Sequence, residues 1–166
     1  MTTGKRLASV LIVLLALIGT KTVFAAGVEI PPVNNLNELG RISQQQGIPV
    51  VVFVSRDACP YCRTLRDTIL VPMLTAGKFE HRAIIVEASL DQVNPFTGFE
   101  NRQITAMDFG QFYRAEITPT LLFLDSEGRE IGKRITGISN LEFYGHYLQM
   151  SINEALLAVR SEIQQN

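Results

Sequence analysis

The stretch that decides the fold runs from Ile48 to Leu70 and reads IPVVVFVS-RDA-CPYC-RTLRDTIL. Its first part, Ile48–Ser55, is an apolar run rich in β-branched side chains, which is typical of a buried strand. Its last part, Arg63–Leu70, has apolar residues at helical spacing. A buried strand is therefore predicted to lead through a short loop into a helix, with two cysteines at the junction.

Cys59 and Cys62 are the only cysteines, and a bridge between residues so close in sequence restrains the unfolded chain little. A redox role explains the pair better than a structural one. Pro60 suits a first helical turn, so Cys59 is predicted at the N-cap and Cys62 within that turn. The helix dipole and free N–H groups stabilise a thiolate at Cys59, and Arg56 and Arg63 are expected to add to this. Cys59 is then the nucleophile, and Cys62 resolves the mixed disulfide.

A metal site is the alternative reading of the cysteine pair. It needs two further ligands, and the histidines available are His81 and His146. Neither has ligand spacing relative to the cysteines, so we expect no metal and no organic cofactor.

The first 25 residues have the layout of a secretory signal peptide. Lys5 and Arg6 precede the apolar run Leu7–Ile18, and small residues at Val23 and Ala25 place cleavage after Ala25. We therefore expect an exported, periplasmic protein, in a compartment where disulfides are made and reduced. The alternative is an uncleaved signal anchor that tethers the chain to the membrane, although this run spans only about 18 Å as a helix.

The remaining chain is predicted to hold a linker at 26–35 and one domain at 36–165. The full chain is 46% hydrophobic and 19% charged, with a net charge of −1 and no basic stripe, which argues against nucleic acid as a partner. Pro72 should end or kink the cysteine helix. The other predicted elements are a helix capped at Asn35 and ending near Gln46, a strand Arg82–Ser89, a loop Leu90–Gln103, a helix from the Thr105 cap to about Arg114, strands Thr120–Leu124 and Arg129–Thr136 around the turn Asp125–Gly128, and a long helix capped at Ser139 with an apolar face from Leu141 to Ile163.

This order of elements predicts the fold class. A strand, a crossover helix and a second strand imply parallel pairing, and the glycine turn implies an antiparallel pair. We therefore expect an α/β domain with a central mixed four-stranded sheet flanked by helices.

The chain resembles the thioredoxin superfamily over roughly residues 36–165. The shared features are Cys59-Pro-Tyr-Cys62 after a buried strand, Ile117-Thr-Pro-Thr120 before the next strand, Asp125–Gly128, and Gly137-Ile138 before the last helix. The export signal and CPYC site are similar to those of periplasmic thioredoxin-like proteins.

The resemblance implies a thioredoxin-like fold and a shallow docking surface beside the disulfide, formed by Tyr61, Thr118, Pro119, Gly137 and Ile138. It implies that Pro119 is a cis-proline that faces the disulfide. A tight turn there exposes the Thr118 backbone to strand-like pairing with an incoming peptide.

The sequence also departs from the thioredoxin pattern. Phe53 stands where thioredoxin has a buried Asp, Ala58 where it has a Trp, and Glu87 where a Lys is expected. The usual acid–base helper of the resolving thiol is therefore missing, and Glu87 is a possible replacement beneath Cys62. The alternative is a solvated glutamate near a strand end. The double glycine expected of a glutathione site is absent.

These observations predict an exported, monomeric thiol–disulfide oxidoreductase that acts on protein thiols and disulfides. We expect a reductant, because the chain lacks the large helical insertion of a dedicated oxidase. Its electrons would come from a membrane disulfide reductase. The alternatives are a disulfide oxidase or isomerase, a redox-inert adaptor that uses the fold for binding, and a thiol peroxidase.

Overall fold

The computed structural model describes residues 27–165, so the predicted signal peptide lies outside the described residues. The central sheet has the strand order β2-β1-β5-β6. Strand β1 (Val50–Ser55) runs parallel to β2 (Ile84–Ser89) and antiparallel to β5 (Thr120–Leu124), which pairs antiparallel with β6 (Ile135–Thr136). The predicted mixed four-stranded sheet is confirmed.

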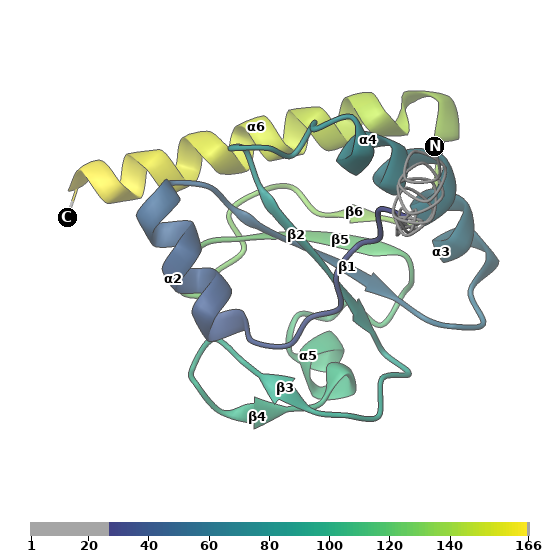
Figure 1. Cartoon of the computed structure of the whole chain (residues 1–166), viewed down its shortest axis with the longest axis horizontal. Helices are drawn as coiled ribbons and strands as arrows, with labels where there is room; N and C mark the ends of the chain where they lie inside the picture. The colour runs from purple at the N-terminus through teal and green to yellow at the C-terminus, as the bar shows by residue number, and fades with distance from the viewer. Residues whose placement is uncertain (1–26, 166) are drawn as a thin grey trace, which may run out of the picture.

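Helices cover both faces of this sheet (Figure 1). One face carries the cysteine helix and α6 (Leu141–Gln165), and the other carries α2 (Leu36–Gln46) and α5 (Ala106–Phe112). In Figure 1, α6 runs along one side of the sheet, and α5 lies on the opposite side. Strand β1 is buried throughout because it lies between two strands and beneath helices on both faces, as its continuous apolar run predicts.

The cysteine helix continues past Pro72, where the sequence predicted an end or a kink. It consists of α3 (Pro60–Leu65), a π-helical turn (Arg66–Leu70) and α4 (Val71–Thr75). The Val71 N–H donates to the Arg66 carbonyl, five residues back. This π turn changes the hydrogen-bond register just before the proline, which lacks a donor of its own.

Two segments differ from their predicted structure. The predicted loop Leu90–Gln103 contains a short hairpin of β3 (Phe96–Thr97) and β4 (Gln103–Ile104). The predicted strand Arg129–Thr136 has regular pairing only in β6. The backbone of Gly132 lies so close to β5 that an added Cβ would come within 2.9 Å of the Phe123 Cβ, and the chain leaves the ladder there.

Apart from the cysteine helix, three helix caps were predicted, and two of them are observed. Asn35 accepts from the Glu38 N–H at 3.0 Å, and Thr105 forms a capping box with Asp108. For α6 the predicted cap at Ser139 is wrong. Asn140 performs this role, since its side-chain oxygen accepts from the Phe143 N–H at 3.3 Å.

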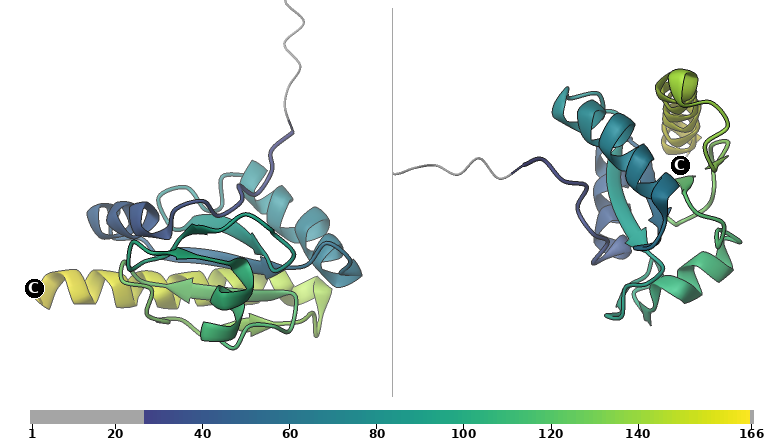
Figure 2. Two further views of the ribbon diagram at one scale, coloured as in Figure 1. Left: turned by 90° about the horizontal axis from the view of Figure 1, so that it is seen from below. Right: turned by 90° about the vertical axis from the view of Figure 1, so that its right-hand side faces the viewer.

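The apolar face of α6 is buried along most of its length. Tyr144, Leu148 and Ile152 are at most 2% exposed, whereas Ile163 is 44% exposed. The last turns of the helix run past the strands, so the prediction that Ile163 packs in the core is wrong (Figure 1). Figure 2 shows the full length of α6 beside the sheet. Within residues 27–165, no helix combines the length and the apolar character needed to cross a membrane.

Candidate functional site

Cys59 lies at the point where β1 has ended and α3 begins. It is the N-cap of α3, with extended backbone angles, and Pro60 occupies the first helical turn. The Cys62 N–H donates to Cys59 Sγ at 3.0 Å, and the two cysteines form a disulfide. The predicted N-cap and first-turn positions of the two cysteines are therefore observed.

The two sulfurs differ in accessibility. Cys59 is 8% exposed, whereas Cys62 is fully buried. Tyr61, between them in sequence, is 65% exposed on the outer side of α3. A partner sulfur can therefore approach Cys59 and not Cys62.

The loop before β5 lies directly beside the disulfide. The Thr118 carbonyl oxygen is 3.8 Å from Cys59 Sγ, and the Thr118–Pro119 peptide bond is cis, as the resemblance implied. The Gly137 N–H donates to the Pro119 carbonyl at 2.7 Å, which joins the end of β6 to this loop. Ile138 packs against the apolar cluster that contains both cysteines. The structure thus gathers the predicted docking residues around Cys59 from three segments.

A polar network holds the loop between β1 and α3. Asp91 accepts from the Asp57 N–H at 2.9 Å and from Arg56 at 3.2 Å, and Arg63 donates to the Asp57 carbonyl at 3.0 Å. Ser89 adds a hydrogen bond to the Asp57 carboxylate. Both arginines that were expected to favour a Cys59 thiolate are therefore already engaged with the loop.

Sequence reasoning missed Asp91, although its position carried a signal. It follows the end of β2, and parallel strands deliver their carboxyl ends to the same edge of a sheet.

Glu87 faces the interior beneath the cysteine helix. It lies opposite Phe53 in the parallel register, so the two side chains share the face of the sheet that packs against Cys62. Its side chain is only 14% exposed and accepts hydrogen bonds from Arg66 and from the Ser55 hydroxyl. Arg66 also stacks over the Phe53 ring, with 5.5 Å to the centroid. Glu87 is therefore not a solvated surface glutamate, and its partner Arg66 was not anticipated.

The described residues offer no metal site of the usual kind. Within residues 27–165, no three or more His, Cys, Asp or Glu side chains lie close enough together to hold a metal ion.

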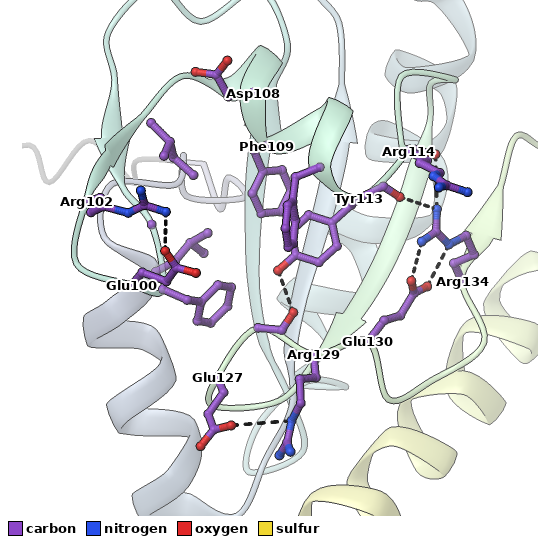
Figure 3. Close-up of a pocket in the computed structure, with 16 residues that line it drawn as sticks. Glu100, Arg102, Asp108, Phe109, Tyr113, Arg114, Glu127, Arg129, Glu130 and Arg134 are labelled. Atoms are coloured by element: carbon purple, nitrogen blue, oxygen red, sulfur yellow. Dashed lines mark hydrogen bonds and ion pairs between the residues drawn. The ribbon is translucent and has the colours of Figure 1, made fainter.

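A cavity lies beyond the carboxyl end of β5 (Figure 3). This cavity has a volume of about 600 Å³ and is formed by the β3–β4 hairpin, α5, the β5–β6 connection and the start of α2. Its lining residues are Leu36, Gly98, Phe99, Glu100, Arg102, Ile104, Asp108, Phe109, Phe112, Tyr113, Arg114, Glu127, Gly128, Arg129, Glu130 and Arg134. The Tyr113 hydroxyl donates to the Gly128 carbonyl at 2.6 Å, and burial raises the pKa of this hydroxyl. Sequence reasoning missed the cavity because its walls come from four distant segments.

The geometry can be compared with that of known proteins. The family model described as thioredoxin-like domain matches residues 37–150. A search of curated proteins finds no match.

Three solved structures show the same fold at low identity. DsbH oxidoreductase is 21% identical, with a TM-score of 0.57 over 76% of this chain and 88% of that one. A poplar thioredoxin h mutant is 16% identical, with a TM-score of 0.54 over 80% and 87%. Thioredoxin O2 from Arabidopsis thaliana is 13% identical, with a TM-score of 0.50 over 74% and 95%.

The arrangement of the site agrees with this likeness. A cysteine pair at the start of a helix, beside a proline loop, supports thiol–disulfide oxidoreductase activity in general. On the fold, the site and the match over residues 37–150, the chain belongs to the thioredoxin-like domain family.

Proposed function

We propose that the protein is an exported, monomeric thiol–disulfide oxidoreductase that reduces disulfides in protein substrates. The observation that carries this proposal is the position of Cys59 Sγ, at the start of α3 and 3.8 Å from the Thr118 carbonyl oxygen. N–H groups at a helix start stabilise a thiolate. A substrate segment that pairs with the Thr118 backbone brings its own sulfur to Cys59.

The reaction proceeds in two exchanges. The Cys59 thiolate attacks one sulfur of the substrate disulfide, and the other substrate sulfur leaves as a thiolate and takes up a proton. Cys62 then loses its proton and attacks Cys59 Sγ, which releases the second substrate thiolate. Two electrons pass to the substrate, each of its two thiolates takes up a proton, one from solvent and one that balances the proton lost by Cys62, and Cys59 and Cys62 end as a disulfide.

The second exchange needs a group that accepts the Cys62 proton. Phe53 occupies the strand position beneath Cys62 and cannot do so. Glu87 is the group we assign to this role, because it shares that face of the sheet and its carboxylate is held inward by Arg66 and Ser55. Proton transfer by a positioned carboxylate typically contributes about 10²–10⁴-fold to a rate.

The charges beside Cys59 support the reducing direction. A disulfide is more oxidising when the thiolate of its reduced form is more strongly stabilised. The charge of Arg56 is offset by Asp91, and Arg63 is held against the Asp57 carbonyl. The stabilisation left for a Cys59 thiolate is then mainly that of the helix start.

The reduction potential of the cysteine pair tests this proposal. We expect a value near that of thioredoxin, about −270 mV, after equilibration with dithiothreitol and quantification by alkylation. A value near about −120 mV would instead make the protein a disulfide oxidase. A folded wild-type protein that fails to reduce insulin, like the Cys59→Ser control, would be a redox-inert adaptor.

Export is a separate part of the proposal and rests on residues 1–25. Mass spectrometry of the protein from an exporting bacterial host is expected to give a mature N-terminus at Ala26. An uncut chain in the membrane fraction would indicate a signal anchor. In either case a reductant outside the cytosol needs electrons, for which we propose a membrane disulfide reductase as partner.

A further inference from the structure

Arg66 lies one helical turn after Cys62 on the same side of the cysteine helix. Its backbone N–H donates to the Cys62 carbonyl, as in a regular helical turn. Side chains four residues apart in a helix lie on the same face. Both therefore lie over the face of the sheet that carries Phe53, and the Arg66 guanidinium carbon is 5.5 Å from the centre of the Phe53 ring.

The π-helical turn begins at Arg66 and separates its side chain from those of two leucines. Leu65 and Leu70 are both fully buried although they are five residues apart, which one π turn allows because its hydrogen bond spans five residues. Arg66 is left at the border of the core, with its side chain 29% exposed. The helix thus buries both leucines and still directs Arg66 toward the sheet.

The Arg66 guanidinium holds Glu87 through both carboxylate oxygens. Its Nε donates to Oε2 at 3.2 Å, and its Nη2 donates to Oε1. The hydroxyl of Ser55, which is fully buried, also donates to Oε1. The planar fork of an arginine fixes the orientation of a carboxylate in a way that a single hydrogen bond does not.

The backbone of Glu87 is fixed on both sides. It pairs with Phe53 of β1 on one side. On the other side, its N–H donates to the Pro31 carbonyl at 2.9 Å, and its carbonyl accepts from the Val33 N–H at 2.8 Å. With the backbone held in place, the direction of the carboxylate depends on its side-chain partners.

The lone pairs of this carboxylate identify the oxygen that can take a proton. A carboxylate has about four acceptor positions, two on each oxygen. Oε1 accepts from Arg66 and from Ser55, whereas Oε2 accepts only from Arg66 among the residues that the structure describes. An acceptor position is therefore left on Oε2.

We propose that Arg66 is a positioning residue for the second exchange, in which it holds Glu87 so that Oε2 accepts the Cys62 proton. The inference rests on the proposed reductase function and adds the group on which the role of Glu87 depends. Cys62 passes its proton to Oε2, and its sulfur attacks Cys59 Sγ. The bond from Cys59 to the substrate sulfur breaks, and that sulfur leaves with the electron pair. The departing thiolate takes up a proton from solvent, and Oε2 returns one to solvent.

A double-mutant cycle between Arg66 and Glu87 tests the proposal. The substrate is a fluorescently labelled peptide whose single cysteine is linked to thionitrobenzoate. Absorbance of the released thionitrobenzoate follows the attack by Cys59, and the fall in fluorescence anisotropy as the peptide leaves follows the second exchange. Arg66→Gln should slow the second exchange about tenfold and leave the first unchanged. In the Glu87→Gln background it should change the second exchange by less than about twofold, because no carboxylate remains to be positioned.

Two further variants separate positioning from a general structural effect. Arg66→Lys keeps the positive charge and loses the fork, so its second exchange should recover to within about threefold of the wild type. Arg41→Gln is the matched control, because Arg41 also holds a glutamate, Glu38, through two N–H groups but at an exposed site on α2. It should keep both rates. Circular dichroism shows whether each variant is folded, and if Arg66→Gln is not, the same cycle is measured with Arg66→Lys.

Each other outcome overturns a specific claim. Equal slowing by the Arg66 substitution in both backgrounds would overturn the positioning role, since Arg66 would then act independently of Glu87. A wild-type second exchange in Arg66→Gln would overturn it as well. A wild-type second exchange in Glu87→Gln would overturn the roles of both residues and leave the reductase function intact. A wild-type protein that releases neither thionitrobenzoate nor peptide would overturn the proposed function itself.

Discussion

The disulfide site and the cavity stand at opposite ends of β5 and are built differently. At the disulfide site, two short segments set the reactive geometry: the start of α3 supplies both sulfurs, and the loop before β5 supplies the carbonyl beside Cys59. The cavity needs side chains from four segments, held by ion pairs that reach solvent. The geometry of the disulfide site is therefore determined by the backbone at the ends of a strand and a helix. The shape of the cavity is determined by how loops pack against one another.

This difference implies that the two ends can be altered separately. A change at the cavity should alter stability and leave the reduction potential as it was. A change beneath the disulfide should alter the exchange steps and leave the cavity intact.

The largest expected effect is at the cysteines. Cys62→Ser should trap Cys59 in mixed disulfides with protein partners, including the proposed membrane reductase, because no thiol remains to resolve them. Cys59→Ser is the matched control and should trap few, since Cys62 is fully buried. Non-reducing gels and mass spectrometry after expression in an exporting host measure this. Equal yields from both variants would contradict the division of roles.

The next effect is on stability at the cavity end. Phe109→Ala should lower the free energy of unfolding by about 3–5 kcal/mol, because it removes a ring that is 1% exposed. Phe112→Ala, on the same helix but 78% exposed, is the control and should change it by less than about 0.5 kcal/mol. Urea unfolding gives both values. A marked shift in the reduction potential of folded Phe109→Ala would show that the two ends are coupled.

Glu87→Gln should slow the exchange between Cys62 and a preformed Cys59 mixed disulfide by roughly 10²-fold at neutral pH, because the amide cannot take the thiol proton. Stopped-flow measurement of product release isolates this step from the first attack. Glu80→Gln, on an exposed turn, is the control. Wild-type rates between pH 6 and 8 would assign Glu87 a structural role as the partner of Arg66.

The smallest effect concerns the capping box of α5. Thr105→Ala should lower the free energy of unfolding by about 1 kcal/mol. Thr68→Ala, at an exposed helical position, is the control for the loss of a threonine side chain. The hydrogen bond from the Thr105 side chain is the main cause that lowers the pKa of Asp108. A carboxyl group whose pKa is lowered by folding stabilises the folded state at pH values above the usual carboxyl pKa. This stabilisation is lost as the pH falls through the pKa that the group has in the folded state. The stability of the wild type should thus fall more steeply than that of Thr105→Ala below about pH 4.

Local signals allowed much of the fold to be predicted. The strand before Cys59, the helix start at Pro60 and the caps at Asn35 and Thr105 each depend on residues within one turn of one another. The parallel and antiparallel pairings follow from the order of the elements, and the cis bond at Pro119 came from the family resemblance.

Features that depend on distant contacts could not be read from the sequence. Asp91 reaches Asp57 only because β1 and β2 end at the same edge of the sheet. Arg66, on the cysteine helix, forms an ion pair with Glu87, on β2, because the helix packs against that strand. The cavity requires the β3–β4 hairpin, which was predicted as a loop, to fold against α5. The cap of α6 was misplaced by one residue because Ser139 and Asn140 are both good capping residues.

The edges of the sheet bear on a different property, resistance to aggregation. The segment from Pro31 to Val33 covers β2, with the Glu87 N–H donating to Pro31 and the Val33 N–H donating to Glu87 at 2.9 and 2.8 Å. At the other edge β6 pairs over only two residues. Proline-bearing covers and very short edge strands both prevent a second sheet from adding on, which is how fibrils begin. A chain shortened to begin at Leu36 would lose the first of these protections and expose β2 as a template for self-association.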